Sequence, residues 1–154
     1  MTFYYIDASA WVKCYYKETG TAWMQNFLLR GEPLACSYLG VVEVMATFAR
    51  KHKAGEINAS ELSEKETALE EDWNSFIQIQ LTAEVMEFAR ETAKNLALRG
   101  ADAVHLASAI FLQRRLAATE RLVLITSDQE LKLAAQLSGL AVIDPDEEET
   151  LASP

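Results

Sequence analysis

Short apolar segments recur along the chain, and longer segments with helical periodicity separate them. Five of these segments have the length and composition of buried strands. They are Phe3–Ile6, Leu34–Cys36, Phe76–Leu81, Leu122–Thr126 and Leu140–Ile143. Because strands and helices alternate, the pattern predicts an α/β fold, an α/β/α sandwich whose mostly parallel sheet is covered by helices on both faces.

Residues that favour helix ends lie between these strands. The start signals are Ser37, Ser60 and Thr82, and the stop signals are Gly31, Gly55, Gly100 and Gly139. The segment Glu61–Trp73 predicts an acid-rich amphipathic helix. This helix is either a surface helix or a contact surface for a partner.

Length and composition indicate one domain. The chain has 154 residues, half of them apolar and about a quarter charged, as is typical of a globular protein. It contains no internal repeat and no Pro- or Gly-rich linker. We predict one domain over residues 1–145, followed by an acidic tail over residues 146–154 that frays.

Targeting and redox signals favour a cytoplasmic protein. The first residues show no basic segment followed by a long apolar run, and no stretch approaches the roughly 20 apolar residues that span a bilayer. Cys14 and Cys36 lie far apart, with no further cysteine to complete a zinc site or a disulfide framework. We expect both to be reduced, buried thiols.

A net charge of −9 argues against a nucleic-acid partner, but the acids are unevenly distributed. Seven fall in residues 56–72 and five in residues 144–149, which leaves 11 acids against 13 bases elsewhere. Basic side chains cluster at Arg50, Lys51 and Lys53, and again at Arg114 and Arg115. They are either contacts for a nucleic acid or solvated helix ends that the helix dipole favours.

Two aspartates directly follow apolar strand segments. Asp7 comes after Phe-Tyr-Tyr-Ile, and Asp128 comes after Leu-Val-Leu-Ile-Thr-Ser. The carboxyl ends of parallel strands are where open α/β sheets place their ligands. Each aspartate could instead cap the helix that follows it.

Two further acids lie within apolar helical segments. Glu43 is the only charged residue between Ser37 and Ala49, so we expect it in a largely buried helix, where it needs a cation, a salt bridge or water. Asp102 begins another apolar segment and could act as a helix-terminal acid or as a ligand. His105, one turn later, is expected to be a core residue or a support for the site more often than a ligand.

The four acids predict a metal site if they converge at one sheet edge. Two ionised carboxylates 4 Å apart repel each other by about 4 kcal/mol at an effective dielectric constant near 20, and a divalent cation removes that cost. Hard oxygen ligands without paired Cys or His favour Mg²⁺ or Mn²⁺. The reaction that best matches such a site is phosphodiester hydrolysis.

These residues occur in motifs that resemble the PIN-domain VapC ribonucleases over the whole chain. The motifs are Tyr5-Ile6-Asp7-Ala8-Ser9, Glu43-Val44, Leu98-Arg99-Gly100-Ala101-Asp102-Ala103-Val104-His105-Leu106-Ala107, Thr126-Ser127-Asp128, Gly139-Leu140-Ala141-Val142 and Asp144-Pro145. Their order and spacing match the family pattern. Ala8 stands where the family commonly has Thr or another small residue, a difference we expect to matter little.

The resemblance implies a fold, a site and partners. It makes Asp7, Glu43, Asp102 and Asp128 the metal-site acids of a Mg²⁺- or Mn²⁺-dependent endoribonuclease, and Ser9 and Thr126 the hydroxyls that orient them. It further implies cleavage of single-stranded RNA, often tRNA, a homodimer, and restraint by a cognate VapB-like antitoxin. The acidic segment over residues 56–72 suits RNA poorly, so we expect RNA to approach along another face, while a basic antitoxin peptide could use that acidity.

Three alternatives differ in class. A catalytically weak PIN scaffold would bind RNA or a protein partner, although the presence of all four acids argues against it. A phosphorylated receiver domain would need an acidic pair after the first strand and a lysine after the last, and the sequence has neither. A larger flap-type nuclease would need a longer chain with more acids and a basic arch.

Overall fold

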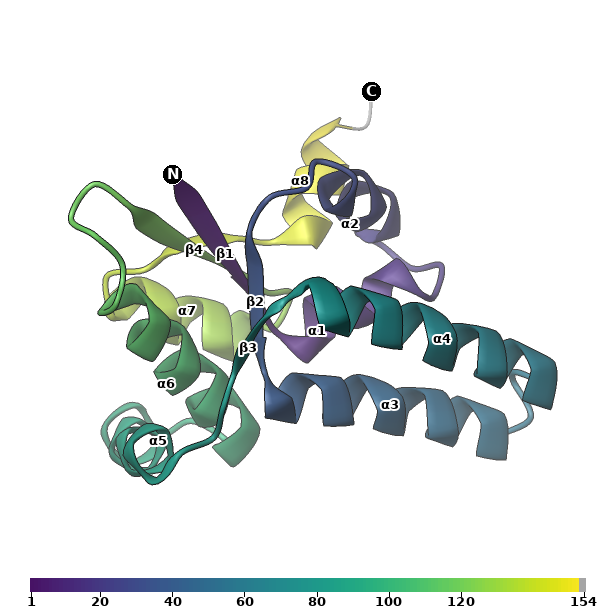
Figure 1. The fold of residues 1–154 in the computed structure, drawn as a ribbon, viewed down its shortest axis with the longest axis horizontal. Coiled ribbons are helices and arrows are strands. Elements are labelled where there is room, and N and C mark those ends of the chain that lie inside the picture. The colour runs from purple at the N-terminus through teal and green to yellow at the C-terminus, as the bar shows by residue number, and fades with distance from the viewer. Residues whose placement is uncertain (153–154) are drawn as a thin grey trace.

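The computed structural model describes residues 1–152 and has a five-stranded parallel sheet at its centre, in the order β3-β2-β1-β4-β5 (Figure 1). The strands are β1 (Thr2–Ile6), β2 (Leu34–Ser37), β3 (Ile77–Ile79), β4 (Arg121–Ile125) and β5 (Ala141–Ile143). The predicted α/β class and parallel sheet are therefore confirmed. All five strands end at the same edge of the sheet, because they run in one direction.

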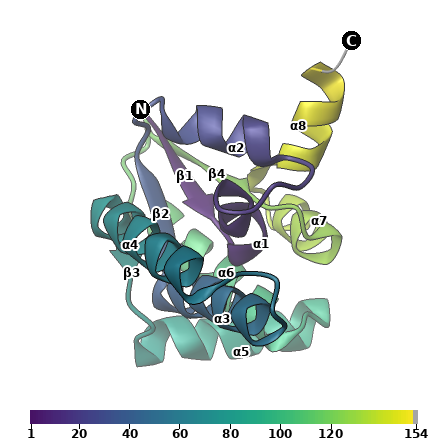
Figure 2. The same ribbon diagram turned by 90° about the vertical axis from the view of Figure 1, so that its right-hand side faces the viewer.

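Helices cover both faces of this sheet (Figures 1 and 2). They are α1 (Ala8–Trp11), a 3₁₀ turn (Val12–Cys14), α2 (Thr21–Leu28), α3 (Tyr38–Lys53), α4 (Ala59–Ser75), α5 (Ala83–Leu96), α6 (Gly100–Gln113), α7 (Gln129–Leu137) and α8 (Pro145–Ala152). Helices α1 to α4 pack on one face and α6 and α7 on the other, while α5 packs against α6. The result is an α/β/α sandwich.

Alternating side chains of the central strands divide the core between the two faces. Ile6 and Ile125 belong to the cluster under α1 to α4, whereas Tyr5 and Leu124 belong to the cluster under α6 and α7. Successive strand residues point to opposite faces, so strands buried on both sides must be apolar throughout. This requirement explains the continuous apolar runs in the sequence.

Two of the predicted helix boundaries are wrong. Helix α4 begins after Asn58, whose side chain accepts a hydrogen bond from the Glu61 amide, and not at Ser60. Gly100 is the first residue of α6 and ends no helix, because α5 already stops at Leu96 with Ala97 in a left-handed conformation. Asn is as good an N-cap as Ser, so local composition does not decide between positions two residues apart.

Helix α3 is less buried than its apolar composition predicts. Its buried residues are Gly40, Val44 and Phe48, while Val42 is 62% exposed and Tyr38 is 41% exposed. The helix runs beside α4 and projects beyond the sheet, so the sheet covers only part of its surface (Figure 1).

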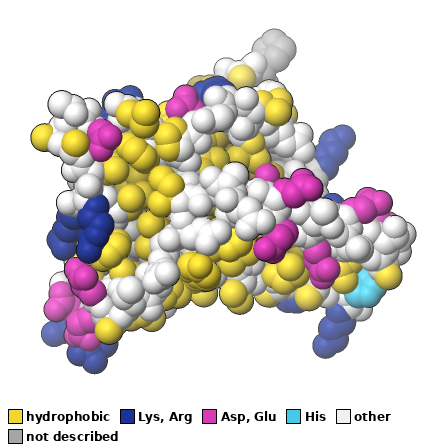
Figure 3. Space-filling view, in the orientation of Figure 1, with side chains coloured by type: hydrophobic (Ala, Val, Ile, Leu, Met, Phe, Trp, Pro, Cys, Tyr) yellow, Lys and Arg dark blue, Asp and Glu magenta, His cyan; other side chains and the backbone are white. Residues whose placement is uncertain are grey.

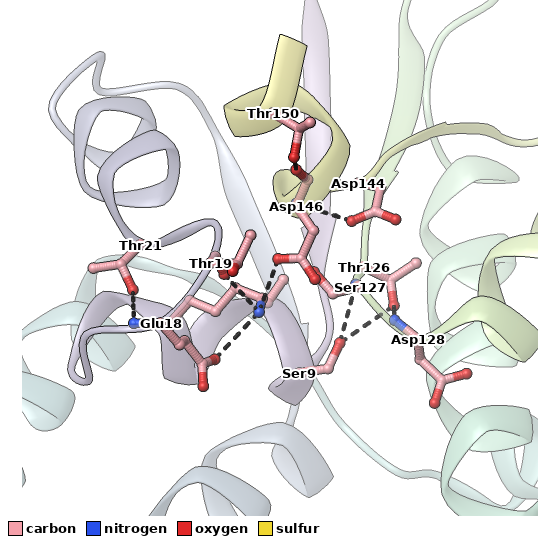
Figure 4. Close-up of polar contacts among 12 residues, drawn as sticks. Ser9, Glu18, Thr19, Thr21, Thr126, Ser127, Asp128, Asp144, Asp146 and Thr150 are labelled. Carbon is pink, nitrogen blue, oxygen red and sulfur yellow. Dashed lines mark hydrogen bonds and ion pairs between the residues drawn. The ribbon is translucent and has the colours of Figure 1, made fainter. Parts of the chain in front are cut away.

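Most of the acidic C-terminal segment is helical over the described residues. Residues Pro145–Ala152 form α8, which packs against α2, and Lys13 pairs with Asp146 at 3.0 Å. Asp144, 3% exposed, accepts a hydrogen bond from the Asp146 amide at the start of this helix (Figure 4). The remainder of the predicted tail, residues 153–154, lies outside the described residues.

Every helix within residues 1–152 is too short or too polar to cross a bilayer. Both cysteines are free thiols; Cys36 is buried as expected, whereas Cys14 is only half-buried. Burial raises the pKa of Cys14 to about 12, so this thiol stays protonated at neutral pH.

Candidate active site

A pocket of about 240 Å³ lies at the edge of the sheet where the strands end. Its lining residues are Asp7, Ala8, Ser9, Glu43, Arg99, Ala101, Asp102, His105 and Asp128. The four acids singled out in the sequence therefore share one cavity. Of the two predicted hydroxyl residues, Ser9 lines the pocket and Thr126 is fully buried behind Asp7.

Four separate segments of the chain supply these acids. Asp7 follows β1, and Asp128 follows β4, the neighbouring strand. Glu43 lies in the second turn of α3, and Asp102 lies in the first turn of α6. Parallel pairing of β1 and β4 brings the two strand-end acids to one edge, and the two helices deliver the others to it.

Three hydrogen-bond donors hold the side-chain carboxylate of Asp7 in one position. Ser9 Oγ donates to its carboxylate at 2.8 Å, Thr126 Oγ1 donates at 2.7 Å, and the Ala10 amide donates at 3.0 Å. The last contact makes Asp7 the N-cap of α1. Capping and pocket lining are therefore compatible roles for this residue.

The same two hydroxyls also contact the backbone of the loop after β4, as Figure 4 shows for Ser9 and Thr126. Ser9 Oγ accepts a hydrogen bond from the Ser127 amide at 3.1 Å, and Thr126 Oγ1 accepts one from the Asp128 amide at 3.1 Å. Each hydroxyl thus accepts from the loop backbone and donates to the carboxylate. This arrangement fixes the position of Asp128 relative to Asp7.

Asp128 also combines two roles. Its Oδ1 accepts a hydrogen bond from the Leu131 amide at 2.9 Å, which caps α7, while its Oδ2 accepts one from Arg99 at 2.7 Å. One carboxylate oxygen of Asp128 therefore caps the helix, and the other contacts Arg99 at the pocket.

Glu43 is supported by a buried histidine and tyrosine. His105, 2% exposed, contacts Glu43 Oε1 through Nε2 at 2.5 Å and Tyr5 Oη through Nδ1 at 2.8 Å. The Ser37 amide donates to the Tyr5 hydroxyl, whose own hydrogen is then available to Nδ1. In the neutral ring this network assigns the hydrogen to Nε2, which donates it to Glu43.

Gly40 lets the start of α3 pass close to Cys36 of β2. A Cβ atom at position 40 would lie 2.2 Å from Cys36 Sγ and 3.5 Å from His105 Cε1. A side chain at position 40 would therefore collide with the Cys36 sulfur, whereas its distance to the His105 ring would be an ordinary van der Waals contact.

Arg99 bridges the other two acids. Its Nη2 lies 2.7 Å from Asp128 Oδ2 and 3.2 Å from Asp102 Oδ2, and its Nε lies 3.6 Å from Glu130 Oε2. The Arg99 side chain remains 67% exposed. Its guanidinium therefore partly neutralises the acids at the open side of the pocket.

Burial raises the pKa of two pocket acids. For Asp7 the effect of burial on the pKa is opposed first by the electrostatic effect of the nearby His105 ring and then by the hydrogen bonds from Thr126, Ala10 and Ser9. For Asp102 the carboxylate of Asp128 adds to the effect of burial, and Arg99 opposes both. Both pKa values are raised because the protein solvates the ionised carboxylates incompletely.

The donor chemistry of the pocket fits a hard divalent cation. All four acids offer carboxylate oxygens, the ligands that Mg²⁺ and Mn²⁺ prefer. Within residues 1–152, no three Asp, Glu, His or Cys side chains converge closely enough to hold one ion as they stand. Arg99 contacts one oxygen each of Asp102 and Asp128, and His105 contacts one oxygen of Glu43.

The basic clusters found in the sequence lie at helix ends. Arg50, Lys51 and Lys53 occupy the last turn of α3, and Arg114 and Arg115 follow α6; none of them lines the pocket. Acidic side chains are spread over α4 (Figure 3). The positions of the basic clusters favour the interpretation that these residues interact with the helix dipoles and not with a nucleic acid. Among the residues that line the pocket, Arg99 is the one with a permanent positive charge.

Sequence reasoning assigned no role to Arg99 or Tyr5 and gave His105 only a supporting one. Arg99 could have been singled out as a charged residue directly before an apolar helix that carries a candidate ligand. Tyr5 and His105 lie 100 residues apart, and no pattern along the chain signals that they meet.

Comparisons of sequence identify the family of this chain. A sequence model of the PIN domain matches residues 4–137. Ribonuclease VapC45 of Mycobacterium tuberculosis is 34% identical to this chain over 142 residues, which cover 92% of this chain and 95% of that protein.

Solved structures share the fold. PAE2754 from Pyrobaculum aerophilum superposes with a TM-score of 0.70 at 20% sequence identity, covering 98% of this chain and 97% of that chain. A chain from a toxin–antitoxin complex of Klebsiella pneumoniae superposes with a TM-score of 0.63 at 20% identity, covering 92% of this chain and 96% of that chain. The α/β/α arrangement is thus common to all three chains.

Proposed function

This chain belongs to the PIN-domain family and is of the VapC ribonuclease type, and from that premise we propose that it is a Mg²⁺- or Mn²⁺-dependent endoribonuclease toxin. One observation carries the proposal: four carboxylates from four segments of the chain share a pocket at the carboxyl edge of the sheet. Carboxylates are brought together at such an energetic cost chiefly where a cation binds.

The proposed ligands are Asp7, Glu43, Asp102 and Asp128. A bound divalent cation would supply positive charge to the phosphodiester oxygens and would acidify the attacking water. Ser9 and Thr126 hold the Asp7 carboxylate in one orientation through their hydrogen bonds. His105 holds Glu43 through Oε1, which leaves Oε2 for the cation.

The proposed substrate, assembly and inhibitor rest on membership of the family and not on the geometry of the site. We propose single-stranded RNA regions, with tRNA favoured, as substrate, a homodimer as the assembly, and the cytoplasm as the location. A VapB-like antitoxin is the proposed inhibitor, supported by the shared fold with a chain from a toxin–antitoxin complex. A basic antitoxin side chain entering the acidic pocket would compete with the cation for the same carboxylates.

The test is cleavage of total tRNA by purified protein that has been freed of antitoxin. Reactions contain Mg²⁺, Mn²⁺ or EDTA, and each is repeated with Asp102→Asn, which removes one pocket charge at constant size. Glu64→Gln removes a charge from the exposed surface of α4 and is the matched control. We expect discrete fragments from the wild type and Glu64→Gln, and none with EDTA or Asp102→Asn.

Two results would count against the proposal. Fragments that persist in EDTA would show that cleavage needs no divalent cation. Intact tRNA, mRNA and rRNA in every reaction would favour the alternative of a catalytically weak scaffold that binds RNA or a protein partner.

A further inference from the structure

Arg99 differs from every other residue that lines the pocket. Among the nine lining residues, all within the described part of the chain, it alone carries a permanently positive side chain. It precedes α6 directly and reaches Asp102 on that helix and Asp128 after β4. Its charge therefore lies against carboxylates that the proposed function assigns to a metal ion.

A purely structural role does not account for this position. The Arg99 side chain is 67% exposed, so water screens its ion pairs and they contribute little to the stability of the fold. Asp128 is already held by its hydrogen bond from the Leu131 amide, and Asp102 by its place in the first turn of α6. Neither acid needs the guanidinium to stay at the pocket.

We infer that Arg99 changes partner during the reaction: it pairs with Asp102 and Asp128 in the metal-free protein and with a phosphate of the RNA once a metal ion is bound. This inference rests on the proposed function. A divalent ion that takes these carboxylates repels the guanidinium and weakens both ion pairs. The side chain has room to turn outward because two-thirds of its surface is exposed.

A phosphodiester is the partner that the freed guanidinium suits best. Arginine offers a planar fork of N–H donors that matches two phosphate oxygens, and such charge-assisted pairs are stronger than neutral hydrogen bonds. A phosphate next to the four acids would otherwise face net negative charge, since the remaining lining residues add no permanent cation. Arg99 is thereby a catalytic residue that contacts the substrate beside the metal.

The experiment compares three variants with the wild type. Arg99→Gln removes the charge, and Arg99→Lys keeps the charge but loses the fork. Arg121→Gln is the matched control, because Arg121 is an exposed arginine at the start of β4, at the opposite edge of the sheet from the pocket. The affinity for Mn²⁺ is measured from the electron paramagnetic resonance of the free ion. Binding of fluorescein-labelled single-stranded RNA is measured with Ca²⁺ in place of Mn²⁺. RNA cleavage is measured at saturating Mn²⁺.

Opposite changes in metal and RNA binding are the expected result. Arg99→Gln should bind Mn²⁺ about 2- to 10-fold more tightly, because a competing cation is gone. The same variant should bind RNA more weakly and lose about 100-fold in kcat/KM at saturating Mn²⁺. Arg99→Lys should retain wild-type Mn²⁺ affinity with an intermediate loss of cleavage, and Arg121→Gln should match the wild type throughout.

Two outcomes would overturn the inference. Weaker Mn²⁺ binding by Arg99→Gln would make Arg99 a scaffold for the acids. RNA binding and cleavage equal to those of Arg121→Gln would exclude phosphate contact. If the wild type cleaves no RNA while Arg99→Gln still gains Mn²⁺ affinity and loses RNA affinity, the proposed hydrolysis fails and the partner exchange of Arg99 stands.

Discussion

Replacing His105 with alanine should weaken metal binding even though His105 is not a proposed ligand. The imidazole is 2% exposed, and its Nε2 contacts Glu43 Oε1 at 2.5 Å. Without this partner, the Glu43 carboxylate loses its fixed orientation and must be ordered when the metal binds. The cost should therefore appear in the dissociation constant of the metal.

The expected magnitude follows from that single contact. A hydrogen bond to a charged group contributes about 1.5–3 kcal/mol. At about 1.4 kcal/mol per factor of ten, this range corresponds to a roughly 10- to 100-fold weaker Mn²⁺ complex. In other metal sites, removing the hydrogen-bond partner of a metal ligand lowers the affinity for the metal by about 10- to 100-fold, which is the same range.

The assay is a Mn²⁺ titration that counts free ion by electron paramagnetic resonance and needs no RNA. His105→Gln is the conservative variant, since its amide can still donate to Glu43; we expect less than about a tenfold loss of affinity. Urea unfolding and circular dichroism establish the folded fraction, because alanine also leaves a buried cavity and a Tyr5 hydroxyl without its His105 partner. A folded His105→Ala protein with wild-type Mn²⁺ affinity would refute the positioning role.

Three further predictions concern the stability of the metal-free protein in urea. Because burial raises the pKa of Asp102, the wild type should lose stability relative to Asp102→Asn as pH rises from about 4 to 7 in EDTA; a difference independent of pH would contradict this. Tyr5→Phe leaves two buried partners unpaired and should cost about 1–3 kcal/mol, more than the control Tyr4→Phe. Gly40→Ala should cost about 1–3 kcal/mol, and the loss should disappear in a Cys36→Ala background; a persisting loss would exclude the sulfur contact as its cause.

Much of the fold could be predicted because the signals are local. Strands buried on both faces must be apolar along their whole length, so β1 and β4 stand out in the sequence. The candidate acids stand out for the same reason, since Glu43 and Asp102 interrupt apolar helices and Asp7 and Asp128 end apolar strands. Burying an ionised side chain costs free energy unless a cation, a hydrogen bond or water compensates its charge. A charged residue within or directly after an apolar segment is therefore recognisable as a candidate site residue from the sequence alone.

Burial and pairing between distant segments could not be predicted. The apolar composition of α3 indicated a buried helix, yet Val42 is 62% exposed because α3 extends past the sheet. The acidic segment Asp146–Glu149 indicated a tail, yet it belongs to α8, which packs on α2 and is paired with Lys13. In both cases the decisive contacts come from residues far away in the chain.

The sequence by itself determined the α/β class, the parallel sheet and the four acids, because each depends on residues next to one another. Tertiary structure alone decided how those acids are held. The contacts of Tyr5 with His105, of His105 with Glu43, and of Arg99 with Asp128 join residues that are 100, 62 and 29 positions apart. Such contacts depend on how strands pair and helices cross, and no periodicity along the chain encodes that geometry.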